Sequence, residues 1–244
     1  MPIRIAFDST HWNTRSVSSP SIDLSAFFDC GKPFEEYGAR DAQIRVIPVV
    51  RLNRQNDENG IYVNTTSTGD DAERTLSPFF LGPCQLYGSY KARRMENAWQ
   101  FSKVYSQHVE NGRPTAEYFA WAEQGWASQA AQRHPMGKEM NGKEAFHWWD
   151  GQPVDKVQAR KRIYVPLYAE RAIEQQFFKD LKGIWEENRK HQEFTLYLMD
   201  FDAYEYVTMS FSQVLNNPKS SMGHGFVVAM LLTDDPALKQ CELR

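Results

Sequence analysis

The spacing of apolar residues changes along this chain, and that change constrains the fold more than any other feature. Up to about residue 75, β-branched residues form short runs typical of strands, at residues 3–7, 44–52 and 61–65. From residue 95 onward, apolar residues recur at steps of three and four, which predicts helices. We therefore expect a single α+β domain in which helices dominate, with a β-rich portion, residues 1–75, packed on a body formed by residues 76–244.

Turn chemistry and proline refine the expected strands. The polar segment 53–60 ends in Asn59-Gly60, which favours a tight turn and predicts a hairpin between the second and third runs. Pro48 lacks a backbone N–H and cannot donate to a neighbouring strand, so its strand is expected at a sheet edge or at a bulge.

Helical spacing predicts three helical stretches. The first covers residues 93–106, and the second covers residues 115–133 with Thr115 as its N-cap. The third runs over residues 155–185, where Pro166 is expected to kink or split it. Residues 193–199 read as a short strand, 211–215 are ambiguous, and 225–232 fit either a buried helix or a buried strand. Residues 135–151 mix glycines, charges and aromatics, which suits a ligand-facing loop or a solvated insertion.

Composition narrows the classes of function. The 244 residues include 28 Lys+Arg and 31 Asp+Glu, a net charge of -3 that makes general affinity for nucleic acid weak. The longest apolar run, residues 226–232, is much shorter than a membrane span, and the N-terminus lacks a signal-peptide pattern, so we expect a cytoplasmic protein without a membrane partner. The 3 cysteines are scattered, and the histidines His134, His147 and His224 lack metal-ligand spacing, so no metal site is expected.

One polar stripe suggests chemistry. On a helix, Glu96, Gln100 and Lys103 would follow one another at steps of four and three, which places an acid, an amide and an amine side by side. The same spacing is also typical of a solvated helix face, and the stripe alone leaves both interpretations open.

The residues around this stripe resemble a known family, the NADAR superfamily. Ser77-Pro-Phe-Phe80 is similar to the family's Ser-Asn-Phe-like turn, and the helix motif ending in Gln-x-x-Lys corresponds to residues 95–103. Further similarities follow in the same order at residues 159–177, 194–202 and 223–232, so the resemblance covers about residues 76–232. The family's Trp-Val-Lys and Trp-Gly elements are replaced here, by residues 163–168 and 203–206, which indicates a divergent member.

Members of that superfamily are N-glycosidases that act on ADP-ribosylated guanine or on ribosylaminopyrimidine phosphates. The resemblance therefore implies a NADAR-like helical body that hydrolyses the N-glycosidic bond of a nucleotide or ADP-ribosyl conjugate, with Glu96 as the central carboxylate. Such a reaction passes through an oxocarbenium-like transition state, which needs a carboxylate near the anomeric carbon or a water and a donor to the leaving base. Asp200 or Asp202 is expected to supply a second carboxylate.

The remaining candidates would bind the substrate. Lys103, Arg160 and Arg162 suit a phosphate, and Tyr87, Trp99, Tyr164 and Tyr168 suit stacking on a flat base. The other expected binding residues are Ser77, Phe79, Gln100 and His224. The mechanism requires no cofactor. The expected partner is a small nucleotide or ADP-ribosylated substrate, with modified nucleic acid left open.

Two other functions remain open. The same residues could form a module that binds ADP-ribose or a nucleotide without cleaving it, because the family's tryptophan is missing. Asp200-Phe-Asp202 also matches the short acidic motif of metal-dependent glycosyltransferases, although no glycine-rich phosphate loop accompanies it.

Overall fold

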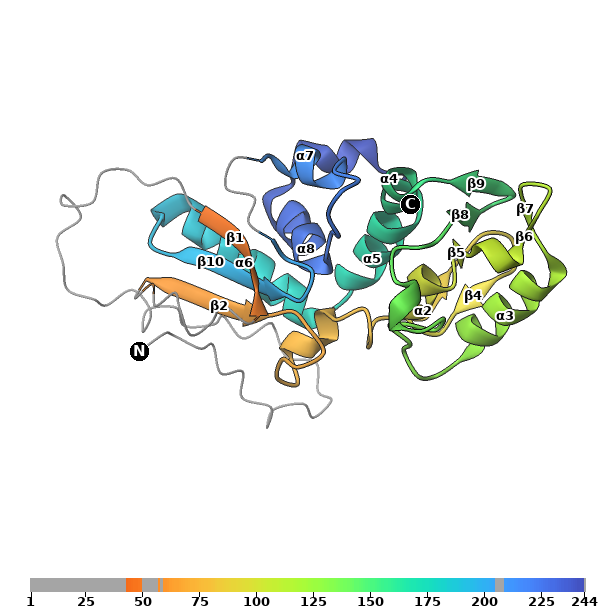
Figure 1. The fold of residues 1–244 in the computed structure, drawn as a ribbon. Helices are drawn as coiled ribbons and strands as arrows, with labels where there is room; N and C mark the ends of the chain where they lie inside the picture. The colour runs from red at the N-terminus through yellow and green to blue at the C-terminus, as the bar shows by residue number, and fades with distance from the viewer. Residues whose placement is uncertain (1–42, 50–56, 58, 205–208, 244) are drawn as a thin grey trace.

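A small parallel sheet joins strands from distant parts of the sequence (Figure 1). The computed structural model describes residues 43–49, 57, 59–204 and 209–243. β1 (Gln43–Pro48) and β2 (Gly60–Asn64) both pair in parallel with β10 (Thr195–Asp200), which lies between them. Alternate residues of these strands, among them Val46, Val63 and Leu198, enter the main hydrophobic core.

The predicted strand at residues 61–65 and the edge position of Pro48 are confirmed, but the predicted hairpin is wrong. β1 and β2 run in the same direction and do not touch as neighbours, because β10 separates them. A local turn does exist, since the N–H of Gly60 donates to the carbonyl of Asp57 at 3.0 Å. The run at residues 3–7 and the end of the run at 44–52 lie outside the described residues.

The sheet also bears on the expected division of the chain near residue 75. Two of its strands come from residues 1–75, while the central strand β10 comes from the body. The described part of the N-terminal portion is therefore built into the same sheet as the body.

Two helices and several short strand pairs form the side of the molecule away from this sheet (Figure 1). The helix α2 (Met95–Gln100) ends earlier than predicted. The Ser102 hydroxyl donates to the Trp99 carbonyl at 2.7 Å and so competes with the helical hydrogen bond, and Lys103 already belongs to a strand. The second predicted helix is α3 (Ala116–Ala127), which also ends early, and Thr115 occupies its N-cap position without a side-chain cap. The short elements nearby are η4 (Glu73–Leu76), β3 (Cys84–Gln85), β4 (Lys91–Ala92), β5 (Lys103–Val104), η5 (Ser106–His108), β6 (Val109–Glu110), β7 (Arg113–Pro114), η6 (Lys138–Met140), β8 (Phe146–Trp149) and β9 (Gln152–Val154).

The third predicted helical stretch splits, but not at Pro166. A continuous helical segment consists of α4 (Lys156–Ala159), the π-helical η7 (Arg160–Tyr164) and α5 (Val165–Ala172). Pro166 is the second residue of α5 and directly follows the π-helical turn η7, so the helical path changes its hydrogen-bond spacing before the proline and continues through it. The break falls at residues 173–175, before α6 (Gln176–His191).

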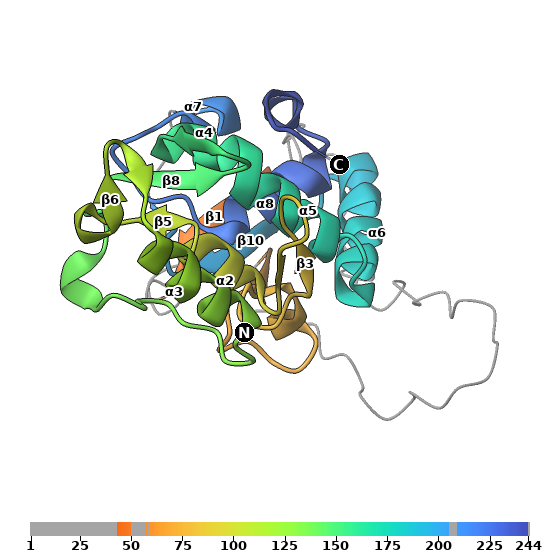
Figure 2. The same cartoon turned by 90° about the vertical axis from the view of Figure 1, so that its right-hand side faces the viewer.

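The C-terminal elements complete the core. The ambiguous residues 211–215 form α7 (Phe211–Leu215), which Ser210 and Gln213 close with a capping box. The apolar run forms α8 (His224–Thr233), whose residues are buried on nearly all sides, and η8 (Pro236–Gln240) follows it. In both views α8 and α5 lie between α6 and the β8 region (Figures 1 and 2). None of the described helices is long and apolar enough to cross a membrane.

Candidate active site

A cavity of about 150 Å³ lies where the carboxyl ends of the sheet strands meet α2. Thr66 and Ser67 line it just after β2, and Phe201 and Asp202 line it just after β10. Ligands of open parallel sheets commonly bind beyond the carboxyl ends of the strands. A space of this size holds one six-membered ring, so it would enclose one part of a larger ligand.

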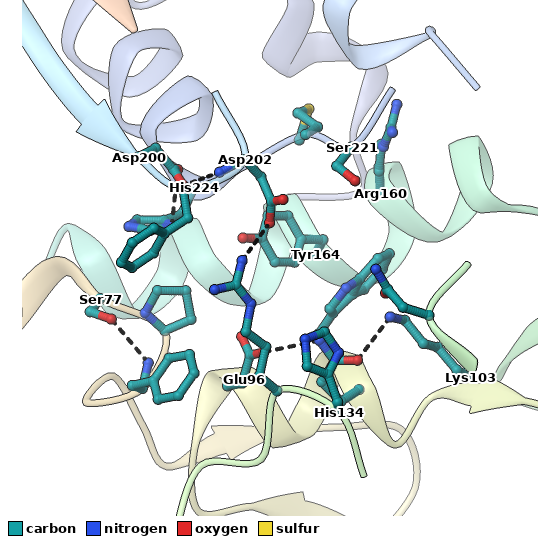
Figure 3. A pocket seen from close by; sticks show the side chains of 18 of the residues that line it. Ser77, Glu96, Lys103, His134, Arg160, Tyr164, Asp200, Asp202, Ser221 and His224 are labelled. Atoms are coloured by element: carbon teal, nitrogen blue, oxygen red, sulfur yellow. Dashed lines mark hydrogen bonds and ion pairs between the residues drawn. The ribbon is translucent and has the colours of Figure 1, made fainter. Parts of the chain in front are cut away.

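Most of the predicted site residues meet at this cavity, and Figure 3 shows several of them. The predicted residues that line it are Ser77, Phe79, Glu96, Trp99, Gln100, Lys103, Arg160, Tyr164, Asp200, Asp202 and His224. Three predicted residues do not line it, namely Tyr87, Arg162 and Tyr168.

The polar stripe of α2 is buried, so its interpretation as a solvated face is wrong. Glu96 is only 7 % exposed, and the Gln100 amide donates to its Oε1 at 2.9 Å. Lys103 lies beyond the end of α2, in β5, and its Nζ donates to Gln100 Oε1 at 2.8 Å. The acid, amide and amine thus form one hydrogen-bonded chain along the cavity wall.

Burial shifts the pKa values at both ends of this chain. It raises the pKa of the Glu96 carboxyl above its ordinary value of 4.5, although the Gln100 hydrogen bond and the charge of Lys103 oppose the shift. Burial also lowers the pKa of the Lys103 ammonium, against the attraction of Glu144 and Glu96. Glu96 is therefore more readily protonated than an exposed glutamate, which is a property of general acids.

The turn before α2 is tied to the start of that helix. The backbone N–H of Glu96 donates to the Pro78 carbonyl at 2.9 Å, and that of Met95 donates to the Leu81 carbonyl at 2.9 Å. Ser77 Oγ accepts the N–H of Phe79 at 3.4 Å within the turn. These bonds hold Ser77 and Phe79 on the same cavity wall as Glu96.

Asp200 and His224 form a buried pair between β10 and α8. His224 Nδ1 lies 3.1 Å from Asp200 Oδ2, and the Gly225 N–H donates to the same oxygen at 2.6 Å. The N–H of Asp202 donates to Asp200 Oδ1 at 3.0 Å. A side chain at Gly223 would overlap this carboxylate, so the close approach requires glycine. Both oxygens of Asp200 are therefore engaged in holding the site together.

Asp202 is more available to a ligand. Its side chain is 49 % exposed, and its Oδ2 lies 3.6 Å from the guanidinium of Arg133. That guanidinium also lies 5.2 Å from the ring centre of Phe201. Arg133 comes from the segment after α3, so this contact joins two walls of the cavity.

Asn97 fixes the segment that leads to Arg133. Its buried amide donates to the carbonyls of Gly125 at 3.1 Å and Ala130 at 2.9 Å, and its Oδ1 accepts the N–H of Gln132 at 2.8 Å. The sequence alone assigned no role to Asn97 or Arg133. The hydrogen-bond partners of Asn97 lie about thirty residues further along the chain. The carboxylate that Arg133 contacts, Asp202, follows β10 and is also distant in sequence.

Arg160 is engaged with backbone oxygens. Its Nη1 donates to the carbonyl of Asn217 at 2.7 Å, and its Nη2 donates to that of Ser220. It therefore supports the loop after α7, which contributes Ser221 and Met222 to the cavity.

The three predicted residues outside the cavity have other contacts. Arg162 pairs with Glu242 at 2.8 Å. Tyr168 is buried, and its hydroxyl donates to the Leu76 carbonyl at 2.6 Å. Tyr87 packs edge-on against Trp149 with 5.1 Å between ring centres. A stacking or phosphate-binding role for these three is not supported by their positions.

The aromatic wall consists mainly of Trp99 and Tyr164, whose ring centres lie 5.0 Å apart. The imidazole of His147 packs against Trp99, with 4.4 Å between their ring centres, and its Nδ1 lies 2.9 Å from Ser102 Oγ. Burial lowers the pKa of His147 well below its ordinary value, so this ring is a neutral support for Trp99.

Sequence reasoning missed several residues of the cavity. The missed polar and charged residues are Thr66, Ser67, Arg133, His134, Asn141, Glu144, Lys156 and Ser221. The segment 135–151 faces a ligand cavity in part, because Asn141 and Glu144 line it, whereas residues 146–149 form the largely buried strand β8, which neither expected interpretation included. Its mixture of glycines and charges was the signal that could have identified Glu144.

Within the described ranges, no group of three or more His, Cys, Asp or Glu side chains is arranged to hold a metal ion. The chain matches no family model, and neither curated proteins nor solved structures include one with significant similarity to it.

Proposed function

We propose that this protein is an N-glycosidase that hydrolyses the N-glycosidic bond of a nucleotide or an ADP-ribosyl conjugate. The observation that carries the proposal is the buried Glu96 carboxyl, which lines the cavity with a raised pKa and only one of its oxygens bonded to Gln100. Among the described residues, no hydrogen bond is made to its Oε2, so this oxygen can meet a ligand. A carboxyl that keeps its proton at higher pH suits protonation of a departing base.

A second carboxylate is needed on the sugar side of the bond. Cleavage develops positive charge at the anomeric carbon, and a carboxylate there stabilises that charge or activates a water. Asp202 fits this role better than Asp200, because it is half-exposed and because both oxygens of Asp200 accept backbone hydrogen bonds. The proposed pair is therefore Glu96 as proton donor and Asp202 as the sugar-side carboxylate.

The aromatic wall supports the same proposal. Trp99 and Tyr164 lie beside the α2 stripe and offer flat apolar surfaces on which a base can stack. The resemblance to the NADAR superfamily at residues 76–232 agrees with a nucleotide-derived substrate.

The test is release of base or sugar from a small panel, detected by mass spectrometry. The panel contains NAD, ADP-ribose, ADP-ribosylated guanosine, DNA that carries this modification, and a ribosylaminopyrimidine phosphate. Glu96→Gln should abolish release while the protein stays folded. Glu170→Gln is the matched control, because Glu170 pairs with Arg171 and does not line the cavity.

The outcomes separate the functions. Release that requires Glu96 supports the glycosidase, and unchanged turnover in Glu96→Gln removes Glu96 from the mechanism. Thermal stabilisation by a nucleotide without release over hours would instead identify a binding module.

A further inference from the structure

Lys156 and Arg160 are two of the cations that line the cavity. Lys156 and Arg160 stand four residues apart on the helical segment that starts with α4. Among the described residues, neither forms an ion pair with a carboxylate, and the polar contacts of both are to backbone carbonyls. The Lys156 ammonium has only the Pro218 carbonyl, at 3.4 Å.

These two charges act unfavourably on each other. Burial lowers the pKa of Lys156, and the positive charge of Arg160 lowers it further. The carboxylates of Glu144 and Asp202 oppose the shift, but they lie beyond ion-pair distance. Carbonyl oxygens hold the guanidinium of Arg160 in place without neutralising its charge. An anion placed between the two side chains would remove this repulsion.

The position of the pair shows which part of a ligand would reach it. In Figure 3, Arg160 and Lys103 lie toward one end of the cavity, and Ser77, Asp200 and His224 lie toward the other. Tyr164 and Glu96 lie between the two ends. Ser221 belongs to the loop that Arg160 holds, and it adds a hydroxyl beside the cations.

We propose that Lys156 and Arg160, with Ser221 beside them, form a subsite for a phosphate group of the ligand. This inference rests on the proposed function and deepens it, because it assigns the residues that would hold a phosphate of the nucleotide substrate. Arg160 is fixed by the carbonyls of residues 217 and 220, so it provides a preset charge. The Lys156 ammonium has only a long contact of 3.4 Å with the Pro218 carbonyl among the described residues, so it can turn toward the phosphate.

The test measures binding, so it does not depend on turnover. Ribose 5-phosphate, inorganic phosphate and ribose are titrated into the full chain by calorimetry. Lys156→Gln should weaken binding of both phosphates about tenfold or more, since it removes one charge-assisted hydrogen bond. Lys156→Arg should keep most of the affinity, and any binding of ribose should be unchanged.

Lys161→Gln is the matched control. It removes the same charge from the same helical segment, but Lys161 does not line the cavity. Equal affinity for phosphate in the wild type and in Lys156→Gln would overturn the subsite, as would an equal loss in Lys161→Gln or no phosphate binding by the wild type. Ribose 5-phosphate contains no N-glycosidic bond, so its binding is measured independently of the proposed reaction. Binding of ribose 5-phosphate together with no base release from any member of the substrate panel would support the subsite while rejecting the glycosidase.

Discussion

Asp200→Asn and Asp202→Asn make the sharpest test of how the two acidic residues differ. Both changes remove one carboxylate from the same short segment after β10. Asp200 is 2 % exposed and its two oxygens meet the Gly225 N–H at 2.6 Å, the Asp202 N–H at 3.0 Å and His224 at 3.1 Å. An asparagine has a single acceptor oxygen, so at least one of these partners would face an NH₂ group.

The expected free-energy changes follow from these contacts. A buried donor that loses its acceptor costs about 1–3 kcal/mol, and a hydrogen bond to a charged acceptor contributes about 1.5–3 kcal/mol. We expect Asp200→Asn to lower the free energy of unfolding by about 3 kcal/mol, since the amide retains one acceptor oxygen but leaves at least one buried partner facing its NH₂ group. Asp202 loses only a half-exposed contact at 3.6 Å with Arg133, for which we expect less than about 1 kcal/mol.

Urea unfolding monitored by tryptophan fluorescence gives both values on one scale. Base release is measured on the same preparations, and we expect Asp202→Asn to lose activity while keeping its unfolding midpoint. If the two variants lost equal stability, or if Asp200→Asn lost less than Asp202→Asn, the assignment of Asp200 as the structural carboxylate would be refuted.

Three further predictions concern the α2 stripe and the packing of two helices. The pKa of Glu96 is raised above 4.5 in the folded state, so the folded protein binds more protons than the unfolded chain and loses stability as pH rises through the folded pKa. Glu96→Gln should flatten that part of the curve of melting temperature against pH. An unchanged slope would contradict the raised pKa. Lys103→Met removes a charge that lowers the pKa of Glu96, so the alkaline limb of the rate of base release should move to higher pH, and a shift to lower pH would count against Glu96 as the acid. In α3, Gly125→Ala would force a methyl group into the ring of Phe101 and should lower the free energy of unfolding in urea by about 1–3 kcal/mol. In α6, the methyl group of Gly183→Ala meets open space, and this change should raise the free energy of unfolding by about 0.5–1 kcal/mol. Equal effects of the two changes would contradict the packing at Gly125.

Local patterns in the sequence predicted what depends on local geometry. The step of four from Glu96 to Gln100 correctly placed two side chains in contact, because helical periodicity alone determines that distance. Pro48 correctly indicated an edge strand, because its missing N–H is a property of one residue. Asp200, Asp202 and His224 were predicted to share a site with Glu96, and all four line one cavity, although the other three follow Glu96 by more than a hundred residues.

What depends on distant partners was not predictable in the same way. Asn59-Gly60 favours a turn, but it contains no information about β10, which enters the sheet between β1 and β2. The burial of Glu96 was equally invisible, because a polar stripe at helical spacing looks the same whether solvent or another part of the chain covers it. Lys156 and Arg133 were missed because isolated charged residues occur throughout the sequence, and neither belongs to a pattern that marks a site.

Arg133 connects α2 with the segment after β10, and its position affects how an anionic ligand would bind. The Asn97 amide on α2 fixes residues 130–132 by hydrogen bonds, and the next residue, Arg133, meets Asp202 beyond the end of β10. The charge of Arg133 also lowers the pKa of Glu96, so one guanidinium acts on both carboxyls of the proposed pair. An anionic ligand would compete with Asp202 for this guanidinium because the present contact, at 3.6 Å, is long and half-exposed. Occupation of the site would then free the Asp202 carboxylate on the sugar side, while Glu96 would keep its hydrogen bond to Gln100 and its place beside the base.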